Sequence, residues 1–126
     1  MRKVAPTLIV DRVEPSLMFF VERLGFTKVA EVPAEDGSLQ FAMVADGEVE
    51  VHLQSRASVE RDLPYLRGAK MPSSSFLYLD VDDVRALWER LQDCEILAPL
   101  EKKFYGATDF FVKEPGGHVL GFSQNG

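Results

Sequence analysis

Residues 9–26 read IVDRVEPSLMFFVERLGF and residues 78–96 read YLDVDDVRALWERLQDCEI, and the two stretches share one order of parts. Their matches at a constant separation are Val10 with Val81, Arg12 with Asp83 and Val13 with Val84, and the run Glu-Arg-Leu then occurs in both. A second pair of stretches, FAMVADGEVEVHLQ (41–54) and FFVKEPGGHVLGFS (110–123), matches Phe41 with Phe110 and Gly47 with Gly116. Ordered matches of this kind predict an internal repeat of two similar modules.

Each module is predicted to run strand, helix and then three further strands. The segments APTLIV (5–10) and SFLYLDV (75–81) are rich in residues that favour strands. A helix follows each strand, because apolar residues recur at helical spacing, and Gly25 is placed to end the first helix. The apolar positions are Leu17, Phe20, Val21 and Leu24 in the first helix and Val84, Leu87, Trp88 and Leu91 in the second. The remaining strands are expected at about 26–33, 39–45 and 48–54 and at about 94–98, 108–113 and 117–123.

Length and composition predict a single domain, and the strands and helices predicted for its two modules make the expected class α+β. The chain has 126 residues, of which 46% are hydrophobic and 27% charged, as is typical of globular proteins. Module one is expected at about 1–55, a connector at about 56–74 and module two at about 75–126. The connector is predicted to carry a short helix starting at Ser58, and its interleaved charges, including Arg61, are expected to be solvated.

The charge balance and the start of the chain restrict the classes of partner. The formal net charge is -6, which disfavours nucleic acid and anionic membrane surfaces as partners. The chain contains 1 cysteine, Cys94, which is expected to be a packed thiol. The stretch MRKVAPTLIVDRVEP shows neither a signal peptide nor a membrane-spanning helix, so a cytoplasmic location is expected.

Four stretches resemble the vicinal oxygen chelate superfamily, which includes glyoxalase I, extradiol dioxygenases and bleomycin-resistance proteins. They are APTLIVDRVEPSLMFFVERLGF, DGEVEVHLQS, FLYLDVDDVRALWERL and FYGATDFFVKEPGGHVLGF, which together cover most of the chain. The resemblance implies two βαβββ modules whose mixed sheets curl around a cleft, usually in a homodimer. It does not define the chemistry, because one fold of this kind hosts several activities.

Metal-using members of this superfamily carry ligands at four related positions, which the resemblance places at Ala5, His52, Phe76 and Gly121. A divalent ion needs oxygen, nitrogen or thiolate donors, typically three or more from the protein. Only His52 carries such a donor, so neither a metal of the family kind nor another cofactor is expected. A register shift of one or two residues would bring in Thr7, Tyr78 or Glu50, which is also a poor ligand set.

Strand alternation predicts which side chains line the cleft. Glu50 and His52 belong to the polar face of EVEVHLQS, and Phe76 and Tyr78 belong to the cleft face of SFLYLDV. With open space above Gly121, such a surface would suit a flat, partly apolar ligand. The KKFYGA loop is expected either to close over the ligand or to pack against the end of the sheet, with its lysines solvated. The predicted ligand-binding residues are Glu50, His52, Phe76, Tyr78, Phe104, Tyr105 and Gly121.

His52 has two interpretations. It is the candidate catalytic residue if the protein is an enzyme, because an imidazole near its ordinary pKa can act as a general base. Glu50 is then expected to lie too far along the strand to be its direct partner. Alternatively, His52 is a polar residue on a half-exposed face of the sheet.

Two functions from different classes therefore remain open, beside a purely structural module. The first is a metal-free protein, similar to the bleomycin-resistance branch, that binds or sequesters a cationic or aromatic small molecule. The second is a glyoxalase- or dioxygenase-type enzyme, a lyase or an oxidoreductase, with a displaced metal site or with His52 as base. The missing ligands, the acidity and the aromatic cleft residues favour the first.

Overall fold

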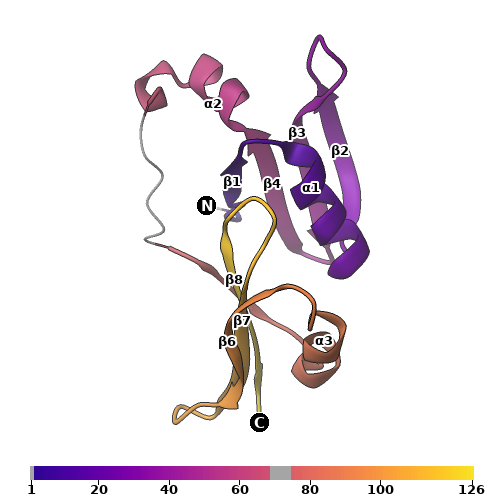
Figure 1. Cartoon of the computed structure of the whole chain (residues 1–126), viewed down its shortest axis with the longest axis vertical. Coiled ribbons are helices and arrows are strands. Elements are labelled where there is room, and N and C mark those ends of the chain that lie inside the picture. The colour runs from indigo at the N-terminus through magenta and orange to yellow at the C-terminus, as the bar shows by residue number, and fades with distance from the viewer. Residues whose placement is uncertain (1, 69–74) are drawn as a thin grey trace. The chain divides into compact units, whose positions relative to one another are not determined.

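The computed structural model describes residues 2–68 and 75–126, and the chain divides into two compact units, Met1–Lys70 and Met71–Gly126 (Figure 1). Residues 69–74, the end of the expected connector, lie outside the described residues. Each unit contains a four-stranded mixed sheet with helices, and the predicted α+β class with two βαβββ modules is confirmed.

The first unit has its first strand beside its last. The sheet order is β1-β4-β3-β2, in which β1 runs parallel to β4 and the other pairs are antiparallel. The parallel pair forms because the helical segment carries the chain back across the sheet before β2 begins. The elements are β1 (Thr7–Val10), α1 (Val13–Met18), η1 (Phe19–Arg23), β2 (Thr27–Pro33), β3 (Leu39–Asp46), β4 (Val49–Ser55), α2 (Arg56–Asp62) and η2 (Pro64–Leu66).

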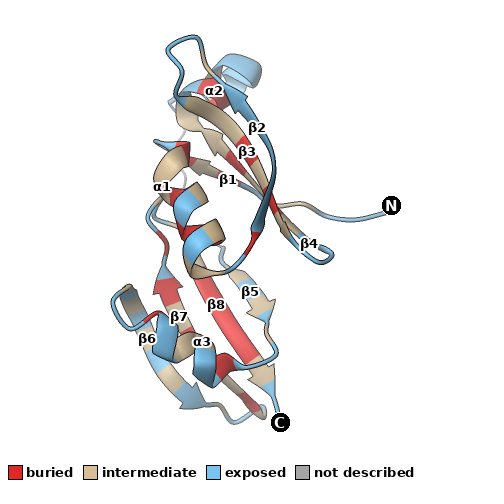
Figure 2. Ribbon diagram, turned by 90° about the vertical axis from the view of Figure 1, so that its right-hand side faces the viewer, coloured by how far each residue is buried: buried red, intermediate tan, exposed pale blue. Residues whose placement is uncertain are grey.

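The face of this sheet that packs against α1 is apolar. Val51 and Leu53 of β4 are buried, together with Ala42 and Val44 of β3, as alternation in EVEVHLQS predicts (Figure 2). The opposite face carries Glu50, His52 and Gln54. The helix therefore occupies one face, and the polar residues of the candidate site occupy the other.

The first helix is less regular than its sequence pattern indicates. After α1 the chain forms the π-helix η1, in which Phe19 and Phe20 are both buried. A π-turn takes up an additional residue, so it rotates the following side chains relative to an α-helix. Consequently the predicted stripe is only partly buried, with Leu17, Val21 and Leu24 intermediate. Gly25 ends the helix as predicted, with a φ of 80° that favours glycine.

The second unit repeats this arrangement. Its sheet order is β5-β8-β7-β6, with β5 parallel to β8. The helix packs against β7 and β8, where the Trp88 ring lies 5.2 Å from the ring of the fully buried Phe110. Trp88 therefore lies on the side of α3 that meets the sheet, as the helical spacing of the apolar residues predicts. The elements are β5 (Leu77–Asp80), α3 (Val84–Arg90), β6 (Glu95–Lys102), β7 (Ala107–Lys113) and β8 (Val119–Asn125).

Strand registers show the repeat directly. Thr7 of β1 is opposite His52 of β4, and Tyr78 of β5 is opposite Gly121 of β8. The first strands of the two units are related by one separation along the chain, and the last strands by another. Both separations agree with the sequence matches. His52 and Gly121 occupy equivalent positions.

The match of Phe41 with Phe110 is wrong by one residue. Phe41 is opposite Gln54, and the equivalent pair in the second unit is Asp109 with Ser123. The cause is the turn of the last hairpin, which has two residues after Asp46 but three after Glu114, where the Glu114 N–H donates to the carbonyl of His118. Gly117, with a φ of 95°, provides the left-handed residue of this longer turn.

The connector helix starts earlier than expected. α2 begins at Arg56, because the Ser55 hydroxyl accepts a hydrogen bond from the Ser58 N–H at 3.2 Å and so caps the first turn. Ser58 lies inside the helix and is buried. None of the helices in residues 2–68 and 75–126 has both the length and the apolar character needed to cross a membrane.

Candidate functional site

In the first unit, the structure brings His52 and Glu50 together on the sheet face opposite α1. They are two residues apart on β4, and the His52 Nε2 atom lies 3.6 Å from Glu50 Oε2. Glu50 was expected to lie too far along the strand to be a direct partner of His52. Its side chain comes within 3.6 Å of the imidazole but forms no hydrogen bond with it. The separation is just beyond hydrogen-bond distance, so the two side chains are neighbours without a hydrogen bond.

His52 Nε2 is an unusual atom for a buried position. It is shielded from solvent and has no hydrogen-bond partner among the described residues. The imidazole ring packs edge-on against Phe41 at 5.3 Å. Glu50 in turn forms an ion pair with Lys3. The hydrogen bond from Lys3 is the main reason that the pKa of the Glu50 carboxyl is held below its usual value.

In the second unit, aromatic side chains gather on the sheet face opposite α3. Phe76 lies 6.4 Å from Tyr78, centroid to centroid, and 5.3 Å from Phe111, while the Tyr78 and Phe111 rings are stacked at 6.0 Å. Phe104 and Tyr105, from the loop between β6 and β7, meet edge to face at 5.1 Å. The exposed fractions are 55% for Phe76, 48% for Tyr78, 100% for Phe104 and 54% for Tyr105.

Gly121 does not open a space for a ligand. A Cβ atom at this position would lie 2.5 Å from Cε2 of Phe111, whose ring already covers the glycine. The expected open volume above Gly121 is therefore filled by Phe111, a residue that the sequence reasoning did not select. The absence of a side chain at position 121 allows Phe111 to lie flat against the sheet beside Tyr78.

Asp109 organises the polar part of the same face. Its carboxylate is fully buried, and one oxygen, Oδ2, accepts hydrogen bonds from the hydroxyls of Tyr78 and Tyr105, each at 2.7 Å. The other oxygen, Oδ1, accepts from Lys103 Nζ at 2.6 Å. Lys103 was expected to be solvated, and its ion pair with a buried carboxylate corrects that expectation.

The pKa values in this cluster follow from its contacts. Burial raises the pKa of Asp109, but the hydrogen bonds from Lys103, Tyr105 and Tyr78 outweigh it, so the pKa is lowered overall. The hydrogen bond to Asp109 raises the pKa of Lys103. It also raises the pKa of Tyr105, because a phenolate would face the carboxylate. Asp109 is therefore ionised at neutral pH, and both Lys103 and Tyr105 keep their protons.

The predicted site residues thus form two groups within their own units. Glu50 and His52 meet in the first, and the phenols of Tyr78 and Tyr105 converge on Asp109 in the second. Asp109 and Phe111 were missed, although alternation along ATDFFVK puts both on one face of β7.

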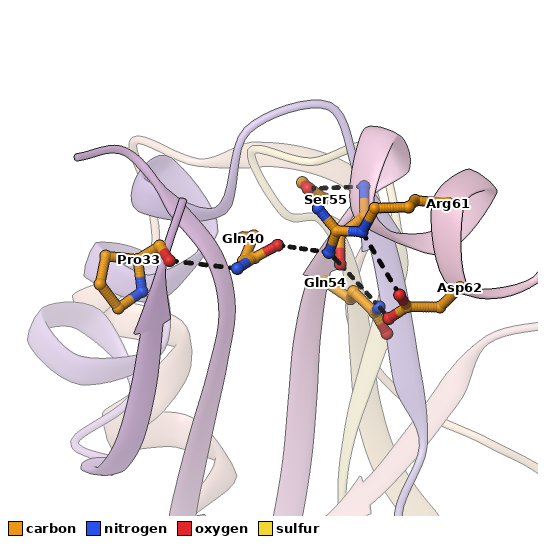
Figure 3. A network of polar contacts seen from close by, with 7 residues as sticks. Pro33, Gln40, Gln54, Ser55, Arg61 and Asp62 are labelled. Carbon is orange, nitrogen blue, oxygen red and sulfur yellow. Dashed lines mark hydrogen bonds and ion pairs between the residues drawn. The ribbon is translucent and has the colours of Figure 1, made fainter. Parts of the chain in front are cut away.

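A further polar network in the first unit was also not expected. Arg61 of α2 donates from Nη2 to Gln40 Oε1 at 2.6 Å (Figure 3). Gln54 donates to Ser58 Oγ at 3.0 Å. Arg61 also contacts Asp62, with 3.5 Å between Nε and Oδ1. Arg61 is therefore not merely solvated, because it connects α2 to the start of β3.

Beside this network lies a hollow of about 380 Å³, whose lining includes Asp11, Arg12 and Arg61. A second hollow, of about 330 Å³, lies in the other unit. Its lining includes Asp82 and Asp83, which are the counterparts of Asp11 and Arg12 in the repeat. A hollow occurs at the same place in both units although the charges of its lining residues differ. The hollow is therefore a consequence of the backbone arrangement of the module.

The donor set does not fit a metal ion of the kind that the superfamily implies. Of the four positions where ligands are expected, Ala5, Phe76 and Gly121 offer no donor, and His52 stands alone. Within residues 2–68 and 75–126, no group of three or more His, Cys, Asp or Glu side chains is placed to hold a metal.

These features define a class of α+β proteins that are built from two repeated βαβββ modules, each with a four-stranded mixed sheet. Residues 4–122 match the Glyoxalase/Bleomycin resistance protein/Dioxygenase superfamily, and the chain belongs to that family. The predicted resemblance is therefore confirmed.

Relatives and solved structures agree with this assignment. The chain is 28% identical over 129 residues to bleomycin resistance proteins of Geobacillus stearothermophilus and Staphylococcus aureus, covering 94% of this chain and 93% of theirs. TioX from Micromonospora sp. ML1 is similar in structure, with a TM-score of 0.78, 20% identity and 99% of both chains covered. A lactoylglutathione lyase from Agrobacterium tumefaciens has a TM-score of 0.73 and 14% identity, covering 98% of this chain and 94% of its own. At such identities the two structures share the fold with this chain.

Proposed function

We propose that the protein binds or sequesters a small molecule and does so without a metal ion. The observation that carries this proposal is the aromatic surface of the second unit, defined as Phe76, Tyr78, Phe104, Tyr105 and Phe111. Large aromatic side chains that gather in the open on a folded protein mark binding surfaces, because their exposure costs free energy unless a ligand covers them.

The ligand that best suits this surface is aromatic, cationic or both. A flat ring stacks on exposed aromatic side chains, and a cation is attracted to their faces. The formal net charge of -6 adds a weaker, long-range attraction for cations. The similarity to proteins named for bleomycin resistance supports a binding role, although it does not identify the ligand.

The metal-free part of the proposal rests on the donor set, and elemental mass spectrometry tests it directly. Untagged protein, purified without chelator, is expected to carry far less than one metal ion per chain, before and after incubation with nickel, zinc, iron or manganese. A thermal-shift screen with cationic aromatic compounds is then expected to show ligand-dependent stabilisation. One tightly held ion per chain or per pair of chains would contradict the proposal and favour an enzyme.

A second candidate function is supported by His52. A buried imidazole nitrogen with a carboxylate 3.6 Å away is a plausible general base, as a glyoxalase- or dioxygenase-type enzyme would require. The test is turnover of a hemithioacetal or a catechol by the wild type, by His52→Ala and by Gln54→Ala, a control on the same face of β4. Turnover that only His52→Ala abolishes would establish this alternative. Stabilisation by ligands without turnover would favour the binding protein.

We also propose that the protein forms a homodimer, as the family resemblance implies, and that it acts in the cytoplasm. Light scattering after size-exclusion chromatography tests the first point. A mass corresponding to one chain of 14.1 kDa at micromolar concentration would contradict it.

A further inference from the structure

We propose that Asp109 fixes the hydroxyl protons of Tyr78 and Tyr105, so that the aromatic surface presents hydrogen-bond acceptors and selects flat aromatic ligands that carry an N–H donor. This inference rests on the proposed binding function and names the ligand class of the same surface. Asp109 acts in it as a positioning residue, because it is buried and reaches the ligand only through the two phenols.

The direction of each hydrogen bond follows from the chemistry of its partners. An ionised carboxylate has no proton to give and can only accept, whereas a phenol has one proton and oxygen lone pairs. Since Oδ2 of Asp109 lies 2.7 Å from both phenol oxygens, both Tyr78 and Tyr105 must donate to it. Lys103, at 2.6 Å from Oδ1, keeps the carboxylate ionised by supplying a compensating charge.

A phenol that has committed its proton can still accept a hydrogen bond but cannot donate one. Tyr78 and Tyr105 are 48% and 54% exposed as whole residues, and the lone pairs left on their oxygens are the acceptors proposed for a ligand. A ligand that offers an N–H group satisfies these oxygens. A ligand that offers only an acceptor faces two phenols whose protons are already donated to Asp109, and it loses its hydrogen bonds to water without replacement.

The rings beside the phenols determine the shape of the ligand. Phe111 is stacked with Tyr78, and Phe76 stands edge-on to both, which leaves a small apolar platform next to the two hydroxyls. A planar aromatic molecule covers such a platform with little loss of conformational entropy. The platform and the phenol oxygens together fit a ligand that has a flat ring with an N–H group at its edge.

The charges on the same face favour a cation over an anion. Strand pairing places Asp80, Ser123, Asp109 and Glu101 in one row across the sheet, so three carboxylates share this face. Lys103 pairs with Asp109 and also attracts Glu101, so one positive charge faces the three carboxylates, and Asp80 and Glu101 are exposed. An anionic ligand would have to approach these two exposed carboxylates, and a protonated amine or amidine would be attracted by them.

Two matched pairs of small probes separate the hydrogen bond from the charge. Indole and benzofuran have the same shape and no charge, but only indole has an N–H donor. Benzamidine and benzoate are similar in size and opposite in charge. Dissociation constants for all four are measured by two-dimensional amide NMR titration, with the signals of Tyr78, Phe111 and Gly121 as reporters of this surface.

The wild type is expected to bind indole about 2- to 10-fold more tightly than benzofuran, the range that one neutral hydrogen bond supplies. Tyr105→Phe should reduce this preference, because it removes one of the two phenol oxygens that accept from the indole N–H. Asp109→Asn should reduce it as well, because the amide oxygen stays opposite Lys103 and the amide nitrogen then donates to the phenols, which releases their protons. Loss of a merely structural residue would weaken both probes together, so the ratio distinguishes positioning from stability.

The outcomes distinguish this inference from the proposed function. Equal binding of indole and benzofuran, tighter binding of benzoate than benzamidine, or an unchanged ratio in Tyr105→Phe would overturn the inference and leave the binding function standing. Failure of all four probes to shift any reporter signal at millimolar concentration would overturn both. If Asp109→Asn does not fold, Tyr105→Phe decides the question, because its ring is half exposed and its hydroxyl alone is removed.

Discussion

Replacing Gly121 by alanine is expected to destabilise the second unit through a clash with one residue. The new Cβ would lie 2.5 Å from Cε2 and 2.9 Å from Cδ2 of Phe111, whereas carbon atoms in contact are normally about 3.5–4.0 Å apart. The Phe111 ring cannot turn away freely, since Phe76 and Tyr78 pack against it at 5.3 Å and 6.0 Å. One of these rings must therefore move.

Two effects of opposite sign contribute to the expected change in the free energy of unfolding. Forcing an additional carbon into a packed site costs about 1–3 kcal/mol. Alanine also restricts the unfolded chain, which stabilises the protein by about 0.4–1 kcal/mol where the native backbone suits alanine. That condition holds at Gly121, which is not among the glycines with positive φ. The net expectation is a loss of about 1 kcal/mol in the free energy of unfolding.

Urea unfolding in two backgrounds tests this reasoning. In the wild type, Gly121→Ala should lower the midpoint. In a Phe111→Ala background the clash is absent, so the same substitution should become neutral or stabilising by up to about 1 kcal/mol. The change of sign is the critical result. Equal destabilisation in both backgrounds would show that Phe111 is not the reason for glycine at this position.

Three further predictions concern other parts of the chain. Folding lowers the pKa of Asp109, so its contribution to stability is present above its unfolded pKa of about 3.9 and is lost as the pH falls through the folded value. The urea midpoint of Asp109→Asn should then decline less steeply below about pH 4 than that of the wild type, and parallel curves would contradict this. Glu114→Gln should cost about 1–3 kcal/mol in urea unfolding, because the buried carboxylate accepts from the N–H groups of Gly116 and His118, while exposed Glu48→Gln in the other hairpin should change little. Phe104→Ala should leave the unfolding free energy within about 0.5 kcal/mol of the wild type but weaken indole binding, and unchanged binding would remove Phe104 from the proposed surface.

Much of the fold could be predicted because its signals are local. Alternation in EVEVHLQS and helical spacing around Trp88 identify the apolar faces, and both faces pack as expected. The match of Phe41 with Phe110 is wrong because the last hairpin of the second unit has an additional turn residue. That residue can be located only when the hydrogen-bonded pairs of the strands are known. Similarly, the π-turn after Met18 depends on the packing of Phe19 and Phe20, which no local pattern specifies.

The candidate site was less predictable because its contacts join distant positions. Alternation could have indicated that Asp109 lies beside Phe111, and an acid inside an otherwise apolar strand is a recognisable signal. The convergence of Tyr78 and Tyr105 on that acid could not be predicted, since it depends on how the loop after β6 returns along the sheet. Likewise, the ring that fills the space at Gly121 comes from a neighbouring strand.

Equivalent positions in the two units carry unlike chemistry on one face and like chemistry on the other. His52 corresponds to Gly121 and Phe41 to Asp109, whereas the helix-facing Leu53 and Phe122 are both buried and apolar. A duplicated scaffold of this kind separates the residues that maintain folding from those on the opposite face of the sheet. Each half can therefore accumulate changes in recognition without reconstructing its core, so one ancestral surface can diverge into two independent ones.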